Sequence, residues 1–218
     1  LDKLERFKGH FYNWYRTDTL IVLNPAYVST VDSGNLAICL TILAEGLREQ
    51  KEDSLAQKAD QYVKDMQFGF LYDLDRKVFS IGFNCNENQL DNSYYNLLAS
   101  EARLTSLIAI GLNQIPAEHW FDLGRPMIKT THGTSLISWG GTMFEYLMPS
   151  LFVNNFPNTL LWETCFASVK EQINFAKSKK STWGISESGY YSFDFQYNFQ
   201  YQQFGIPNLS LKANNYDN

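Results

Sequence analysis

The chain has 218 residues, a formal net charge of −5 and only 19% charged residues. A chain of this length can bury a core without disulfides or metal ions, and its shortage of basic residues argues against a nucleic acid partner. Aromatic residues make up 16% of the sequence, a surplus over what a core usually needs, and stacking on carbohydrate is one use for such a surplus. No run of 18 apolar residues exists, so the segment is expected to make no direct membrane contact.

The cysteine and histidine residues predict no disulfide frame, no metal site and no other cofactor. The three cysteines are widely spaced and odd in number: Cys39, Cys85 and Cys165. Cys39 and Cys165 lie in helical apolar patterns, so we expect buried thiols in a reducing, cytoplasmic compartment. The three histidines are scattered without zinc-ligand spacing: His10, His119 and His132. The chain starts at Leu1 without Met or a signal sequence, which suggests a segment of a longer protein.

The first third of the chain is predicted to be mainly helical. Residues 1–15 have apolar side chains at helical spacing, and residues 17–30 resemble a loop with short strand character. A helix should begin near Asp32 or Ser33, either of which can cap it, and bury the face of Leu36, Leu40, Leu43 and Leu47. A second helix over residues 53–67 would complete an αα-hairpin.

The middle of the chain combines a predicted β-hairpin with a third long helix. Residues 68–84 alternate apolar and polar positions around a polar turn, which indicates the hairpin. The third helix should run from Asp91 or Ser93 to about Leu112. On it, Glu101 shares an apolar face with Leu97 and Leu104, which is costly for a charge unless it is paired. Such a conflict marks either a functional acid or a structural Glu with a buried partner.

Loops and two further helices are expected next. Residues 116–121 predict a short helical turn, and residues 122–138, rich in Gly and hydroxyl side chains, predict a long loop. A helix over residues 143–152 should kink or end early at Pro149 and carries Glu145 one turn from its start. Residues 159–180 form the longest predicted helix, with Trp162 and Phe166 on its apolar face.

The segment 182–191 contains Trp183, Glu187 and Tyr190 between glycines and hydroxyl residues. Such a segment gains little core energy from its aromatic residues unless they line a site. It predicts one wall of a sugar-binding groove with Glu187 as an acid–base group; the alternative is a surface loop with a solvated Glu. Residues 194–201 alternate aromatic and polar side chains, which indicates a strand or an extended aromatic wall, and a loop should follow to Asn218.

Three acids, Glu101, Glu145 and Glu187, are set among Trp, Tyr and Gly residues. Two carboxylates of this kind suit glycosidic bond chemistry, because one must stay protonated and the other ionised. Serine hydrolase chemistry fits worse, since no GxSxG motif exists and no His has an evident Ser partner by motif. Phosphate-binding glycine motifs are also absent from the sequence.

Several blocks of the sequence form long, distinctive motifs: residues 10–15 (HFYNWY), 27–36 (YVSTVDSGNL), 79–82 (FSIG), 90–104, 119–121, 138–149, 183–188 (WGISES) and 204–207 (FGIP). These motifs resemble the glucoamylase-like region of bacterial cyclic β-1,2-glucan synthases. The resemblance spans nearly the whole chain. It implies a mainly α fold, an (α/α)6 toroid, in which residues 1–218 belong to one catalytic domain.

The resemblance also implies an enzyme that acts on linear β-1,2-glucan as a retaining transglycosylase, without a cofactor. It matches Glu187 to the family's acid/base and Glu101 to its nucleophile, with Glu145 as a third candidate. Expected sugar-contacting residues are Trp14, Tyr15, Asp32, Asp91, Tyr94, Tyr95, Trp139, Trp183 and Tyr190. Two alternatives are an inverting glucan hydrolase and a non-catalytic glucan platform.

The parent synthases of this family are large, membrane-bound proteins with further catalytic domains, which would be partners of this segment. A full toroid needs about twelve helices, whereas the sequence predicts six or seven. We therefore expect an incomplete barrel in a soluble segment of a protein that sits in the bacterial inner membrane.

Overall fold

The structure, a computed structural model, describes residues 1–211 apart from the side chains of Tyr190 and Gln202. The chain divides into two compact units. The first unit comprises Leu1–Asn96 and Ala102–Leu123, and the second comprises Leu97–Glu101 and the chain from Gly124 onward. That residues 1–218 form one domain stays a prediction. The expected loop beyond Leu211 lies outside the described residues.

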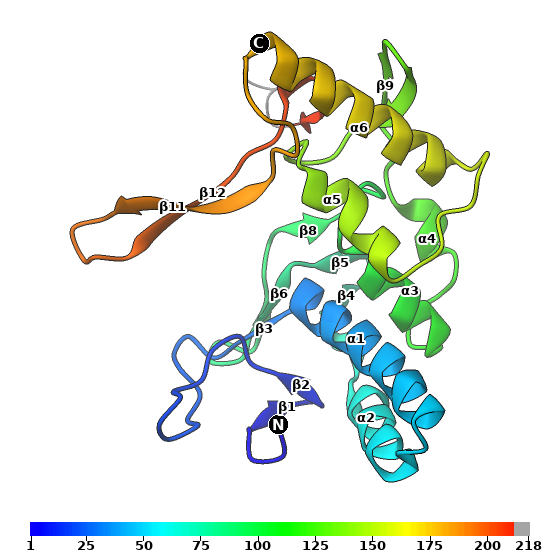
Figure 1. Cartoon of the computed structure of the whole chain (residues 1–218). Helices are drawn as coiled ribbons and strands as arrows, with labels where there is room; N and C mark the ends of the chain where they lie inside the picture. Colours follow the sequence, from blue (N-terminus) through cyan, green and yellow to red (C-terminus); the bar gives the residue numbers. More distant parts are fainter. Residues whose placement is uncertain (212–218) are drawn as a thin grey trace. The chain divides into compact units, whose positions relative to one another are not determined.

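The first unit is built on the predicted αα-hairpin of α1 (Thr30–Glu49) and α2 (Asp53–Asp65), which lie side by side (Figure 1). Ser29 caps α1 by accepting a hydrogen bond from the Asp32 backbone amide, so neither predicted capping residue is the cap. Small apolar residues such as Ala37 and Ala44 let the helices approach closely, and they share a core with Phe68 and Phe79. Leu43, predicted to be buried, is 51% exposed.

Two predictions for the first unit are wrong. Residues 1–15 do not form a helix but contain a hairpin of β1 (Arg6–Phe7) and β2 (His10–Phe11). The third helix starts twelve residues after the predicted Asp91, because α3 spans only Arg103–Gly111. Residues before it pair with other strands instead, and strand pairing between distant segments overrides a local helical pattern.

The remaining elements of the first unit are short. They are β3 (Tyr27–Ser29), β6 (Gly82–Asn84) and β7 (Gln89–Leu90) in one antiparallel sheet; β4 (Tyr72–Asp73), β5 (Val78–Ser80) and β8 (Tyr94–Tyr95) in another; η1 (Phe68–Leu71); and α4 (His119–Asp122). The predicted β-hairpin at residues 68–84 is confirmed in its β4–β5 part. The predicted helical turn is confirmed as α4.

The second unit packs α5 (Met143–Leu147) and a hairpin against α6 (Leu160–Ser178). The hairpin, β9 (Met127–Thr130) and β10 (Gly133–Leu136), replaces the predicted long loop. As predicted, Pro149 ends the short helix early, in η2 (Met148–Leu151). Figure 1 shows a second hairpin, β11 (Glu187–Phe193) with β12 (Phe199–Gln203), and η3 (Pro207–Leu209) completes the unit.

Helix α6 is confirmed, but the face it buries is not the predicted one. Trp162 and Phe166 are 40% and 49% exposed, whereas Thr164, Ser168 and Gln172 are buried. Cys165 is buried as expected, but Cys39 on α1 is exposed. The prediction of a mainly helical chain is confirmed only in part, because five small antiparallel sheets accompany the helices in the described residues. No helix there is long and apolar enough to cross a membrane.

Candidate active site

All three candidate acids lie in the second unit, and Glu145 is the most completely surrounded. It occupies the third position of α5 and forms a capping box with Thr142. Its carboxylate accepts hydrogen bonds from the Ser138 hydroxyl (2.9 Å), the Gly140 amide (3.0 Å), and both the amide and the hydroxyl of Thr142 (2.9 Å each). At 2% exposure it is a buried anion held by four donors, which explains its place in the fold without a ligand.

Glu101 is half-buried in the turn that precedes α3, not on the predicted helix face. In the described part of the chain, its side chain accepts a long, 3.4 Å hydrogen bond from the Ser100 hydroxyl and a hydrogen bond from its own backbone amide. Burial raises the pKa of Glu101 to about 7, and the charges of Glu145 and Glu187 act in the same direction. Near neutral pH, Glu101 can therefore hold a proton and donate it.

Glu187 is the first residue of β11, and the loop before it is fixed from α6. The buried side chain of Gln172 accepts hydrogen bonds from the amides of Gly184 (3.2 Å) and Ile185 (2.9 Å) and donates one to the Ile185 carbonyl (3.0 Å). The Ser186 hydroxyl accepts a further bond from the first turn of α5. Gln172 thus holds the segment that precedes Glu187, a role that the sequence pattern did not reveal.

Both oxygen atoms of Glu187 are engaged by β12. Tyr201 donates its hydroxyl hydrogen to one oxygen, and the Gln203 amide donates to the other at 3.0 Å. Burial and then the bond to Glu187 raise the pKa of Tyr201 to about 12, so the phenol remains a donor. Two donors aimed at one carboxylate fix its position and orientation. The aromatic–polar alternation of residues 194–201 was the sequence signal for Tyr201.

The other predicted sugar-contacting residues of the second unit are dispersed. Trp139 is half-buried, and its carbonyl accepts a hydrogen bond from Ser210. Trp183 is 52% exposed and immediately precedes Gly184, whose amide donates to the Gln172 side chain. The side chain of Tyr190 lies outside what the structure describes, although its backbone pairs with Gln200.

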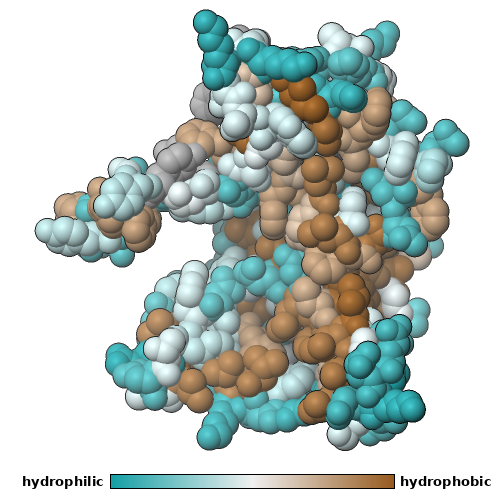
Figure 2. Space-filling view, viewed as in Figure 1, coloured by the Kyte–Doolittle hydropathy of each residue, from teal (hydrophilic) through white to brown (hydrophobic). Residues whose placement is uncertain are grey.

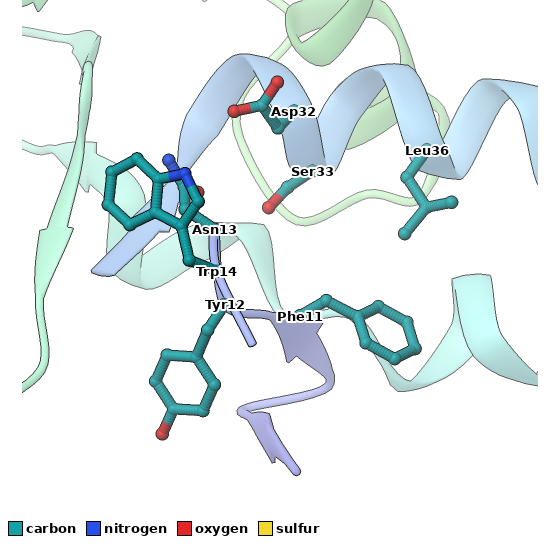
Figure 3. Close-up of a pocket in the computed structure, with 7 residues that line it drawn as sticks. All are labelled: Phe11, Tyr12, Asn13, Trp14, Asp32, Ser33 and Leu36. Carbon is teal, nitrogen blue, oxygen red and sulfur yellow. The ribbon is translucent and has the colours of Figure 1, made fainter. Parts of the chain in front are cut away.

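In the first unit, Trp14 and Asp32 line one pocket of about 470 Å³. Figure 3 shows the indole beside Asn13, with Asp32 and Ser33 on the first turn of α1 across from it. Phe11, Tyr12 and Leu36 complete the lining. An exposed indole next to a carboxylate and hydroxyls is a combination that binds sugars, so this pocket is a candidate sugar subsite in its own right.

The remaining predicted residues have structural partners. Asp91 accepts hydrogen bonds from the Ser93 amide (3.0 Å) and the Tyr27 hydroxyl (3.4 Å). Tyr15 donates its hydroxyl to the Glu5 carbonyl at 2.7 Å. Tyr94 lies under the guanidinium of Arg76, and Tyr95 pairs with Phe79 in the sheet.

A buried Ser–His pair escaped the sequence motifs. Ser106 is 2.8 Å from Nε2 of His119, whose Nδ1 faces the Lys77 carbonyl at 2.9 Å. Both side chains are buried, and the third partner is a carbonyl instead of a carboxylate. Burial lowers the pKa of His119, so the pair is a satisfied core contact without a path for substrate.

The acids of the second unit therefore differ in their chemistry. Glu101 has a raised pKa and few donors, which suits a proton donor, while Glu187 has two donors, which suits an ionised nucleophile or base. The charge of Glu187 also contributes to the raised pKa of Glu101. Among the described residues, no three potential ligands gather to hold a metal ion.

Comparison with known proteins supports the resemblance seen in the motifs. The chain is 39% identical over 201 residues to the cyclic β-(1,2)-glucan synthase NdvB of Rhizobium meliloti (strain 1021), a match that covers 85% of this chain. The resemblance to part of a cyclic β-1,2-glucan synthase is thus confirmed. The chain spans only 7% of that synthase's length. No protein-family model matches the chain.

Among solved structures, an endo-β-1,2-glucanase from Talaromyces funiculosus in complex with sophorose matches 95% of this chain with a TM-score of 0.76 and 12% identity. A variant of that glucanase with bound β-1,2-glucan matches equally well, at 11% identity. The match covers 48% of the glucanase chain, so the two proteins share a fold over about half of that enzyme.

Proposed function

We propose that this chain carries the catalytic carboxylates of an enzyme that rearranges β-1,2-glucan as a retaining transglycosylase. The observation that carries the proposal is the difference between Glu101 and Glu187. One carboxyl holds a proton near pH 7, and the other is a hydrogen-bonded carboxylate in the same unit. The similarity to a cyclic β-1,2-glucan synthase supplies the substrate class.

The electrostatics favour roles opposite to those that the motif resemblance implies. Glu101, with its raised pKa, is proposed as the acid/base, and Glu187 as the nucleophile. Glu145 is left out of the pair, because its four donors account for it as a helix cap. Tyr201 and Gln203 are proposed to orient Glu187.

In the proposed first step, an oxygen of Glu187 attacks the anomeric carbon, and the glycosidic bond breaks as its oxygen takes the proton of Glu101. The product is a glycosyl ester on Glu187. In the second step, the Glu101 carboxylate accepts a proton from an incoming sugar hydroxyl, and that oxygen displaces Glu187. A hydroxyl from the same chain closes a ring, a hydroxyl from another chain gives a rearranged glucan, and water gives hydrolysis.

The (α/α)6 toroid belongs to this proposal as well. The fold match with a glucanase supports it and also favours a second candidate function, an inverting glucan hydrolase. The two differ in carboxyl separation, about 5–5.5 Å for retention against about 6.5–9.5 Å for inversion. A non-catalytic glucan platform is a third possibility. The further domains of a synthase, as partners, and a position at the inner membrane remain proposals that the likeness to NdvB motivates.

The test is incubation of the purified protein with linear β-1,2-glucan, followed by mass spectrometry and a reducing-end assay. Rings or rearranged chains without new reducing ends are expected, whereas short reducing sugars of inverted configuration would establish the hydrolase instead. An unchanged glucan would overturn both enzymatic assignments. Retained turnover in the Glu187→Gln variant would leave the protein an enzyme but remove this residue from the mechanism.

A further inference from the structure

The hairpin of β11 and β12 carries large aromatic side chains that face solvent. Tyr191, Phe199 and Tyr201 are 91%, 62% and 61% exposed, and Phe193 is also exposed. We call these four residues the aromatic strip. In the space-filling view, hydrophobic atoms, shown in brown, lie on the surface of the narrow hairpin among pale and teal ones (Figure 2). Exposed aromatic surface of this extent is unfavourable in water and usually marks a binding surface.

The strand register places the aromatic strip on the same face as Glu187. Glu187 pairs with Gln203, Gly189 with Tyr201, and Phe193 with Phe199. Side chains two residues apart point to the same side of a strand, so Gln203, Tyr201 and Phe199 form one row. Tyr191 joins this row through ring contacts with Phe193 (5.5 Å) and Phe199 (6.3 Å).

The strip is long and open. Gln203 lies four positions after Phe199, which is about 13 Å of strand and longer than one pyranose ring. Opposite Tyr201 lies Gly189, which has no side chain to cover the phenol ring and where an added Cβ would meet open space. Phe193 and Phe199 stack with their centroids 4.5 Å apart and keep the outer end of the strip in place.

The composition of the hairpin favours a neutral ligand over an anionic one. No Lys or Arg occurs between Lys180 and Lys212. The acidic side chain at the tip, Asp194, is occupied by hydrogen bonds from the amides of Gln196 (2.8 Å) and Asn198 (2.9 Å). Loops that bind anionic lipid surfaces use basic residues, which this segment lacks. Aromatic rings flanked by neutral amides suit an uncharged, hydroxyl-rich chain.

We propose that the aromatic strip is an extended subsite along which a β-1,2-glucan chain runs away from Glu187. This inference rests on the proposed function, because the glucan is the substrate proposed above. Sugar rings stack on Tyr201, Phe199, Phe193 and Tyr191 in turn, so the strip holds a long chain and adds nothing for a disaccharide. It thereby selects glucan by length.

Binding is measured by calorimetry in a Glu101→Gln background, which blocks turnover, with long linear β-1,2-glucan and with sophorose as probes. Phe199→Ser and Tyr191→Ser are each expected to weaken binding of long glucan about 3- to 10-fold, the loss of one aromatic contact, with sophorose affinity unchanged. Gly189→Leu should act in the same way by covering Tyr201. Its backbone is compatible with a side chain, so folding is not at risk.

Phe156→Ser is the matched control, because Phe156 is an equally exposed phenylalanine, 63%, outside the hairpin. It should bind both probes as the background does. The proposal would be overturned if all variants bound long glucan with equal affinity, or if each strip variant lost as much affinity for sophorose as for long glucan. Sedimentation with anionic phospholipid vesicles that Phe199→Ser abolishes would also overturn it, since the occupant would then be a membrane surface.

The two proposals fail in different ways. If wild-type protein processes glucan and strip variants bind it normally, only the strip is wrong. If long glucan binds through the strip but wild-type protein leaves it unchanged, only the proposed activity is wrong. If wild-type protein neither binds nor changes the glucan, both are wrong.

Discussion

The first turn of α5, which carries Glu145, and the segment Leu97–Glu101 each place a Glu side chain in the second unit. The two side chains differ in the number of hydrogen-bond donors around them. Glu145 is the more deeply buried residue, yet four donors point at its oxygen atoms. Glu101 is less buried but receives fewer hydrogen bonds, a long one from Ser100 and one from its own amide, and its pKa rises to about 7. At Glu101 the effect of burial on the pKa therefore exceeds the effect of its donors. This comparison separates a structural Glu from a proposed catalytic one.

The largest expected effect comes from removing the proposed pair. Glu101→Gln should lower turnover of β-1,2-glucan about 10²- to 10⁴-fold, because the leaving oxygen loses its proton donor. Glu187→Ala should be at least as damaging, but azide should restore bond cleavage by taking the place of the nucleophile. The measurement is the rate of glucan conversion, with the melting temperature as a check on folding.

The assignment of roles can be reversed by the same variants. An aryl glucan with a good leaving group needs no proton donor for bond cleavage. The Glu101→Gln variant should therefore still form the glycosyl ester on Glu187 from that substrate. If azide instead rescues the Glu101→Ala variant and not Glu187→Ala, then Glu101 is the nucleophile, as the motif resemblance implies.

The pH dependence of turnover is the next largest effect. An acid with a pKa of about 7 is protonated below that pH and loses its proton as the pH rises through it. The value of kcat/KM should therefore fall about tenfold per pH unit between pH 7.5 and 9. A profile that stays flat to pH 9, or that rises through pH 7, would contradict Glu101 as the first-step acid.

Glu145 should affect stability far more than chemistry. Glu145→Gln replaces a carboxylate that accepts four hydrogen bonds, so it should lower the free energy of unfolding by about 2–4 kcal/mol. Thermal melting should fall by about 4–16 °C. Below that temperature glucan should still be turned over, with the alkaline fall of kcat/KM shifted to slightly lower pH, because the charge of Glu145 helps to raise the pKa of Glu101. Glu163→Gln, at an exposed position in the first turn of α6, is the control; an inactive but stable Glu145→Gln variant would return Glu145 to the catalytic site.

Local apolar pattern predicted the position of two long helices. Helices α2 and α6 are confirmed in their extent, although α6 buries a different face from the predicted one. The apolar pattern gave a wrong prediction where pairing with strands elsewhere in the chain determines the structure. Residues 89–90 and 94–95 lie in such strands and not in the third helix. Glu101 was selected by a helical stripe that does not exist, yet its neighbours Leu97 and Leu104 are indeed buried. The apolar residues around Glu101 therefore predicted correctly that this segment is buried, but predicted wrongly that it is helical.

The rest of the candidate site depends on specific polar contacts that no period encodes. Gln172 is fully buried because its amide pairs with the backbone before Glu187, while Trp162 on the apolar stripe stays exposed. The sequence marked Glu187 through its unusual local composition. The donors Tyr201 and Gln203 became evident only through the register of β11 with β12.

The smallest expected effect is the stability cost of the raised pKa itself. In the unfolded chain Glu101 ionises near its ordinary value of 4.5, whereas in the folded protein it keeps its proton to about pH 7. The folded state binds more protons in this window, so its stability falls as the pH rises from about 4.5 to 7 and then levels off. Glu101→Gln removes that loss. Its melting temperature should match wild type at pH 4 and exceed it at pH 8 by about 6–12 °C, for about 3 kcal/mol. Glu163→Gln should show no such pH-dependent gain in melting temperature. If Glu101→Gln changes the melting temperature equally at pH 4 and pH 8, Glu101 is not a carboxyl whose pKa is raised by folding.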